Sequence, residues 1–228
     1  MSKRPPLDEH TALLSLVNML ARPSINLYEG WQDEAGIDNT VWTVADPATG
    51  VAWTRGPADG YLRAFSTPAA NETCRLRSNQ AWPFMPDTYG ANTILRKSIL
   101  EFELKLTNVA NIDNTLAFFG LSGVLSDRQS QDLIGWALLA DALQSLTDDG
   151  GAETVNTGFG ETLTNWNKLK IEACAGHVKF YLNEVLVADH TTNLPDDPLY
   201  VNFFVDTEAG GFAMIEVGII RCWFEDIP

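Results

Sequence analysis

The segment from Trp166 to His190 constrains the fold more than any other part of this chain. Apolar and polar residues alternate over two runs, residues 168–173 and 177–182, and a glycine-bearing turn separates them. Alternation with a period of two is typical of antiparallel strands with one buried and one solvent-facing side. A second turn, Asn183-Glu184, leads into an apolar return run. The sequence therefore predicts three consecutive antiparallel strands in this segment.

Short strands are predicted along most of the remaining chain, each bounded by clusters of Gly, Pro, Asn and Asp. These strands span residues 41–44, 51–55, 61–66, 73–78, 98–107, 115–122, 133–140 and 199–205. Many short strands with polar turns between them are typical of an all-β antiparallel sandwich or jelly roll. Tyr28-Glu29-Gly30-Trp31 is expected to open a loop ahead of the first strand.

Two stretches of the sequence resemble a known superfamily. A Trp-Asn-x-Leu-x-Ile strand at residues 166–171 is followed by Gly-x-Val-x-Phe-Tyr-x-Asn at residues 176–183, and a Trp-Thr-Val strand lies at residues 42–44. This pattern resembles the concanavalin A-like lectin/glucanase superfamily, particularly its laminin-G-like members. The resemblance implies a jelly-roll sandwich. It leaves the function open, because lectins, glycanases, adhesion modules and virus structural proteins share this sandwich.

The composition favours one domain and excludes some partners. A chain of 228 residues, 45% of them hydrophobic, can bury the core of one large sandwich, which we place at residues 25–228. The formal net charge is -15 and the basic residues are not clustered, so no nucleic-acid groove is expected. Cys74, Cys174 and Cys222 lack any C-x-x-C spacing, so neither a disulfide framework nor a zinc site is expected.

Residues 1–24 are expected to form a helical arm, because apolar residues recur there at helical spacing between flanking prolines. The arm either packs on its own domain or docks on a neighbouring subunit or larger assembly. It is a poor signal peptide, and no stretch approaches the roughly eighteen apolar residues of a membrane span. We therefore expect soluble synthesis in the cytoplasm. The apolar stripe of the arm consists of Leu13, Leu16, Val17 and Leu20.

Catalysis is not expected from the sequence. Glucanases of the resembling superfamily place acidic residues at alternate positions of one strand, and a retaining mechanism needs two carboxyls roughly 5 Å apart. The nearest match is Glu101 and Glu103, but Lys105 stands at the third position, where it is expected to pair with them. We interpret these residues as a solvated strand face and predict that the protein is not an enzyme.

Histidine and metal chemistry are not expected either. His10, His177 and His190 are placed at the surface or in loops, because no nucleophile motif accompanies them. Laminin-G-like relatives can hold calcium in oxygen-rich loops, and Asp206-Thr207-Glu208 resembles such a loop. The local oxygen count falls short of the six to eight ligands that calcium prefers, so no cofactor is expected and calcium stays an alternative.

Two groups of residues are candidates for binding. Trp82 and Phe84, within a proline-interrupted segment, either cap the core or present an apolar ridge to a partner. Trp166, by contrast, is expected to pack in the core or at a sheet edge. The second group is a strand face of mixed aromatic and polar residues, which suits a sugar cleft in lectin-like relatives, although a second protein layer would cover it equally well. This predicted ligand-binding face consists of Tyr200, Asn202, Phe204 and Asp206.

The sequence thus predicts a non-catalytic interaction protein, most concretely a virion structural subunit such as a capsid decoration, turret or tail-associated protein. Chains of this pattern resemble those of phage-like settings, which implies other virion proteins or further copies of the chain as partners, and the virion as its location. The alternatives are a carbohydrate-binding lectin-like module and, after it, a divergent glycan hydrolase or lyase. Gene neighbours would distinguish these classes.

Overall fold

The computed structural model describes the strands of the chain and several of the connections between them. The described residues are 27–29, 37, 39–45, 52–55, 61–65, 72–82, 96–108, 115–123, 132–139, 142–174, 176–196, 199–207 and 214–226. Every regular element within them is a β-strand. The predicted arm with Leu13, Leu16, Val17 and Leu20 lies outside the described residues, as does Phe84.

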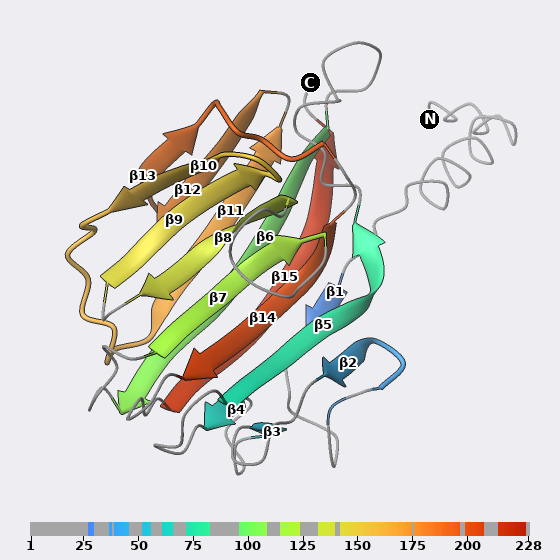
Figure 1. Cartoon of the computed structure of the whole chain (residues 1–228), viewed down its shortest axis with the longest axis vertical. Coiled ribbons are helices and arrows are strands. Elements are labelled where there is room, and N and C mark those ends of the chain that lie inside the picture. Colours follow the sequence, from blue (N-terminus) through green and yellow to red (C-terminus); the bar gives the residue numbers. More distant parts are fainter. Residues whose placement is uncertain are drawn as a thin grey trace, which may run out of the picture.

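The strands form two antiparallel sheets that pack face to face (Figure 1). The first, which we call the β6 sheet, has β6 and β15 side by side in its centre, and β1 (Leu27–Glu29) also pairs with β15. Its strand order is β13 (Val185–His190), β12 (His177–Leu182), β11 (Asn167–Cys174), β6 (Arg96–Asn108), β15 (Met214–Asp226), β4 (Leu62–Phe65) and β3 (Ala52–Arg55).

The second sheet, which we call the β14 sheet, has β14 between β7 and β5. It lies nearer the viewer in Figure 1. Its strand order is β10 (Glu153–Thr157), β9 (Ala142–Asp149), β8 (Asp132–Leu139), β7 (Thr115–Ser122), β14 (Leu199–Thr207), β5 (Glu72–Trp82) and β2 (Trp42–Ala45). The predicted all-β antiparallel sandwich is therefore confirmed.

The alternating segment forms the strands that its pattern predicted. β11 and β12 pair with Ile171 opposite Phe180, and β13 returns along β12. Two expectations were wrong. Tyr28 does not open a loop but lies in β1, opposite Arg221 of β15. Trp166 lies just before β11 and is 43% exposed, so it is neither a core residue nor part of a strand.

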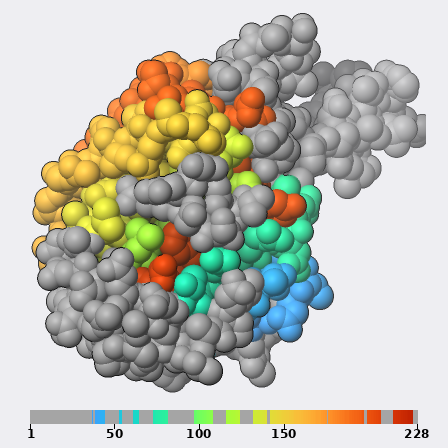
Figure 2. Space-filling view, in the orientation of Figure 1, coloured from blue at the N-terminus to red at the C-terminus, as the bar shows by residue number. Residues whose placement is uncertain are grey.

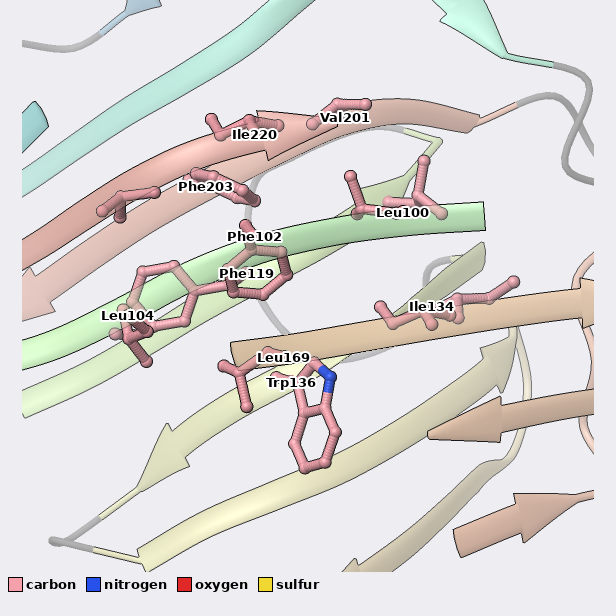
Figure 3. Close-up of a cluster of buried hydrophobic side chains, with 14 of the residues drawn as sticks. Leu100, Phe102, Leu104, Phe119, Ile134, Trp136, Leu169, Val201, Phe203 and Ile220 are labelled. Carbon is pink, nitrogen blue, oxygen red and sulfur yellow. The ribbon is translucent and has the colours of Figure 1, made fainter. Parts of the chain in front are cut away.

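The main core lies between the two sheets, where side chains from both inner faces interdigitate (Figure 3). Phe102 of β6 contacts Phe203 of β14 across the gap, with ring centroids 5.0 Å apart. Phe119 packs against both rings. Because burial of apolar surface stabilises by about 25 cal/mol per Å², this layer holds the sandwich together. The labelled core residues are Leu100, Phe102, Leu104, Phe119, Ile134, Trp136, Leu169, Val201, Phe203 and Ile220.

A second apolar cluster lies on the other side of the β14 sheet. Phe118 and Phe204 stack there with centroids 5.6 Å apart and are almost fully buried. Phe118 lies over Gly135, where an added Cβ would come within 2.5 Å of the ring. The central strands of this sheet are therefore buried on both faces, unlike the one-sided strands of the β6 sheet. The members of the cluster are Phe118, Leu133, Ala137, Leu146 and Phe204.

Candidate functional site

The outer face of the β14 sheet carries the row of residues that the sequence predicted as ligand-binding. Val201, Phe203 and Val205 belong to the core between the sheets, so the residues that alternate with them point outward. We call Tyr200, Asn202, Phe204 and Asp206 the β14 row. Figure 2 looks onto this face of the molecule.

Tyr200 stands at one end of the β14 row beneath a cation. The Arg77 guanidinium of β5 lies 4.5 Å from the centre of the Tyr200 ring, and both side chains are partly exposed. An arginine over a tyrosine face is attracted by the ring quadrupole and fixes the ring's orientation. This end of the row therefore offers a rigid aromatic surface beside several N–H donors.

Asn202 lies in the middle of the row and is fully buried. Its Nδ2 donates a hydrogen bond of 2.7 Å to Ser122 Oγ on β7, but its Oδ1 has no hydrogen-bond partner within the described part of the chain. A buried amide oxygen without a donor costs about 1–3 kcal/mol. The β14 row thus contains an acceptor that a hydroxyl or a water molecule would satisfy.

Phe204 and Asp206 complete the row with different environments. Phe204 is buried in the stack with Phe118, whereas Asp206 is partly exposed and accepts a hydrogen bond of 3.2 Å from Thr73 Oγ1. Only the two ends of the row, Tyr200 and Asp206, therefore reach solvent. The sequence identified the face correctly, and it missed the contributions of Arg77 and Ser122, which come from distant parts of the chain.

Apart from Asp206, the carboxylates described on this outer face lie near the edge of the sheet that β9 and β10 form. The outward positions of β8 are Leu133, Gly135 and Ala137, none of which can transfer a proton. On β9 and β10, Asp148 and Glu153 stand directly opposite each other on the outer face. Directly opposed residues have Cβ atoms roughly 4.5–5.5 Å apart, so these two carboxyls lie close together.

The environment of Asp148 changes its acidity. Asp148 is 4% exposed, and burial raises the pKa of its carboxyl, helped by the charges of Glu153 and Asp149, although the backbone N–H of Gly150 opposes the shift. The Gly150 hydrogen bond to Asp148 Oδ1 is 2.8 Å long. A carboxyl with a raised pKa beside an exposed carboxylate is a pairing that acid–base chemistry uses.

Glu101 and Glu103 lie on the opposite side of the molecule, on the outer face of the β6 sheet. Glu101 forms ion pairs with Lys168 at 2.9 Å and with Arg221 at 3.5 Å. Lys105 does not pair with these two carboxylates as expected, because its contact is with Glu216 on β15 at 3.6 Å. The strand face is charged as predicted. The ion-pair partners of its residues come from neighbouring strands, which the local pattern does not reveal.

The prediction of surface or loop positions for the histidines was wrong for His190. His190 is 2% exposed and lies at the end of β13 between the two sheets, in contact with the Phe180 ring. Burial lowers the pKa of His190 to about 4, against a weaker opposing effect of Asp189. His177 is exposed and lies 3.0 Å from Asp189, while His10 is outside the described residues.

The remaining candidates of the sequence are metal ligands, Trp82 and the cysteines. Among the described residues, no cluster of three or more His, Cys, Asp or Glu side chains could hold a metal ion. Asp206 bonds Thr73, and Glu208 of the calcium alternative lies outside the described residues.

Trp82 is the last residue of β5, opposite Leu199, so it stands at the strand end. Cys74, Cys174 and Cys222 are free thiols, and no described helix is long and apolar enough for a membrane span.

The fold matches several solved structures over almost their whole length. A β-glucanase of Bacillus licheniformis superposes with a TM-score of 0.63 at 16% identity, covering 87% of this chain and 97% of that one. A β-1,3-1,4-glucanase (lichenase) derived from a mouse hindgut metagenome gives 0.62 at 12%, with 89% and 99% covered. A pseudo β-1,3-glucanase of Mycobacterium tuberculosis gives 0.65 at 10%, with 87% and 98% covered.

These matches define the class of fold, a concanavalin A-like jelly roll. A further structural neighbour, a family 16 glycosyl hydrolase from Mycobacterium smegmatis, gives a TM-score of 0.60 at 12% identity, with 86% of this chain and 99% of that one covered. No family model and no curated protein sequence matches the chain. Identities this low show a shared fold and leave the activity to be argued from the site.

The comparisons correct one expectation and leave another without support. The prediction that the protein is not an enzyme is contradicted, because structural neighbours of the chain include two β-glucanases, an endo-1,3-β-glucanase and a further glycosidic hydrolase. The virus setting also receives no support, since none of the structural neighbours named above is a virus protein. The coarser expectation of a jelly roll related to lectins and glucanases holds.

Proposed function

We propose that this protein binds a neutral polysaccharide, a β-glucan, on the outer face of the β14 sheet. The observation that carries the proposal is the pairing of Tyr200 with Arg77 at the exposed end of the β14 row. A sugar ring stacks its C–H face on an aromatic ring while its hydroxyls bond to nearby polar groups. Arg77 supplies donors for those hydroxyls, and Asp206 supplies acceptors at the other end of the row.

The charge of the chain favours a neutral ligand. With a formal net charge of -15, the protein repels polyanionic glycans at long range. Neutral glucans meet no such barrier. The names of the structural neighbours, a β-glucanase and a lichenase among them, support a β-linked glucan as the ligand class.

Affinity electrophoresis in gels that contain a soluble β-1,3-1,4-glucan tests this proposal. The Tyr200→Ala variant should weaken retardation about tenfold, since a central aromatic contact contributes more than 1 kcal/mol. The matched control is Tyr181→Ala, because Tyr181 also lies under a cation, Lys170 at 4.1 Å, but on the outer face of the β6 sheet. Equal retardation of wild type, Tyr200→Ala and Tyr181→Ala would contradict the proposal.

A second candidate function is hydrolysis of the bound glycan by Asp148 and Glu153. The supporting observation is the raised pKa of the buried Asp148 carboxyl directly opposite Glu153. In this mechanism Asp148 in its protonated form gives its proton to the glycosidic oxygen as the bond to the anomeric carbon breaks, and the Glu153 carboxylate bonds to that carbon. A water molecule then hydrolyses this glycosyl ester and returns a proton to Asp148. Reducing ends should appear from the glucan and vanish in Asp148→Asn, but not in the control Asp189→Asn. No release by the wild type would rule this mechanism out.

A role in a virion stays a separate prediction, which concerns the location of this glycan-binding domain and not its ligand. It implies that residues 1–24 attach the domain to a particle or to further copies of the chain. Deleting these residues should then lower the oligomer size in light scattering while the thermal unfolding transition of the sandwich persists. Unchanged size together with unchanged unfolding would contradict it.

A further inference from the structure

We propose that Trp166 is the stacking surface of a second sugar-binding site, on the face of the sandwich opposite the β14 row. The site takes one ring of a neutral pyranose chain. For its ligand class the inference rests on the proposed function, while the site itself rests on a separate set of contacts. We call Trp166, Tyr61, Glu103 and Lys105 the Trp166 platform.

The indole of Trp166 is held against the β6 sheet and remains open to solvent. Its side chain is 43% exposed, although tryptophan is among the most apolar surfaces a protein can present. The Tyr61 ring lies 6.1 Å from it at an angle of 58°, and Tyr61 itself is only 9% exposed. The ring is therefore supported from one side by an almost buried tyrosine.

The segment that carries Trp166 is fixed before any ligand arrives. The backbone N–H of Leu106 donates to Leu163 O at 2.8 Å, which ties this segment to β6. Asn167 Nδ2 donates to Asn165 O at 2.9 Å, and Asn165 N donates to Thr162 O at 3.1 Å. An aromatic group on a rigid backbone loses little entropy on binding, which favours recognition.

Gly218 of β15 makes room for the platform. A Cβ at this position would lie 2.7 Å from Glu103 Oε2 and 3.5 Å from Trp166 Cζ3. The carboxylate and the indole edge therefore approach each other above a residue that has no side chain. This places a hydrogen-bond acceptor beside a flat apolar ring, which are the two groups that a pyranose needs for stacking and for its hydroxyls.

The charged residues near the indole differ in their ion pairing. Glu103 is exposed and makes no ion pair within the described part of the chain, whereas Glu101 on the same strand is held by Lys168 and Arg221. The Lys105 ammonium lies over the Trp166 ring, 5.7 Å from its centre, and 3.6 Å from Glu216 Oε2. An acceptor and a donor thus flank one ring, and a sugar hydroxyl can meet either.

The site can be read directly by nuclear magnetic resonance of the indole N–H groups. The chain has seven tryptophans, and the Trp166 peak is assigned by its loss in Trp166→Phe. Titration with a β-1,3-linked glucose hexamer should shift this peak in the wild type and equally in Tyr200→Ala. A Trp166 peak that stays in place up to millimolar hexamer would overturn the second site, whatever the result at Tyr200.

Substitutions distinguish a role of the platform in sugar binding from a role in packing alone. Trp166→Ala and Glu103→Gln should lower the hexamer affinity about tenfold and threefold, while Glu101→Gln should leave it unchanged. Gly218→Ala should weaken binding with the aromatic ring still present, because its new methyl group displaces Glu103. Equal losses in Glu101→Gln and Glu103→Gln would overturn the assignment, and so would unchanged affinity in Trp166→Ala that still unfolds at the wild-type temperature.

The two sites fail in distinguishable ways. If Tyr200→Ala binds glucan as the wild type does while the Trp166 peak still shifts, the β14 row is not the site and the platform stands. If Tyr200→Ala loses retardation while the Trp166 peak stays fixed, the proposed function stands and the second site is wrong.

Discussion

Thr147 Oγ1 of β9 lies 3.0 Å from His190 Nδ1 of β13, so a side-chain hydrogen bond links the two sheets. Thr147 Oγ1 also donates to Thr192 O, so the imidazole Nδ1–H donates to the threonine oxygen. The second ring nitrogen, Nε2, lies 3.2 Å from Ser145 Oγ and accepts its hydroxyl proton. This arrangement satisfies a neutral imidazole.

The neutral state of His190 predicts a loss of stability in mild acid. Its pKa is about 4 in the folded protein and near 6.5 when unfolded, so the unfolded chain binds the extra proton first as the pH falls. The free energy of unfolding should therefore fall between pH 6.5 and pH 4, by about 3 kcal/mol from this residue. Urea unfolding of wild type and His190→Gln at several pH values measures the effect. A wild-type slope equal to that of His190→Gln would refute it.

The turn between β12 and β13 offers a stabilising substitution. Asn183 and Glu184 have φ angles of 49° and 69°, so both adopt the left-handed conformation of a type I′ turn. Glycine removes the conformational cost that Glu184 carries there, and Glu184→Gly should raise the melting temperature by roughly 2–4 °C.

The contact of Glu184 with Lys168 at 2.7 Å opposes part of that gain. Glu184→Gln keeps the backbone cost and removes only the charge, so it should melt slightly below the wild type. A glycine variant that melts between the wild type and the glutamine variant would show that the ion pair outweighs the turn, and one that melts below the glutamine variant would contradict the cost assigned to the turn.

Local pattern predicted the β11–β12 hairpin better than β9, for a physical reason. β11 and β12 each have one buried and one solvent-facing side, so apolar and polar residues alternate along them. This alternation reveals the hairpin in the sequence. β9 is buried on both faces and buries polar residues, including Ser145, Thr147 and Asp148, which hides any alternation. The sequence therefore missed this strand and with it the Asp148–Glu153 pair.

The surroundings of the candidate site residues depend on contacts between segments that are distant in the sequence. The spacing of residues within one strand does not predict such contacts. The outward row of β14 was predicted because its alternation is local. Asn202 bonds to Ser122 of β7 and Phe204 stacks on Phe118 of the same strand, while the Trp166 indole edge lies beside Gly218 of β15. The role of His190 likewise depends on β9, which no pattern in its own strand indicates.

Gly135 tests the packing beneath the outer face of the β14 sheet. A methyl group there would lie 2.5 Å from Phe118 Cε2 and 3.0 Å from Phe119 O, so Gly135→Ala forces the stacked ring to move. Overpacking of this kind costs about 1–3 kcal/mol. Gly123→Ala is the matched control, since its methyl group meets only ordinary contacts at 3.8 Å or more. Chemical denaturation should separate the two variants, and equal stabilities would contradict the packing described.

Glu216 is a buried carboxylate on the outer face of the β6 sheet, and its removal should be costly. Its Oε1 accepts from Arg63 Nη2 at 2.6 Å, and Oε2 lies 3.6 Å from Lys105. Burial alone would raise the pKa of Glu216, but the hydrogen bonds from Arg63 and Thr107 and the two cations outweigh it and lower the pKa.

Glu216→Gln should therefore cost about 1–3 kcal/mol at pH 7, because Arg63 and Lys105 lose their shared charge partner. Since the folded pKa is lowered, the wild type has this stability above the unfolded pKa near 4.5 and loses it as the pH falls through the folded value. The difference between wild type and variant should shrink accordingly in acid. Glu225→Gln, which removes an exposed partner of Lys97, should change stability by no more than about 0.5 kcal/mol. If the two variants are equally stable at pH 7, the buried carboxylate does not hold β4 and β6 to β15.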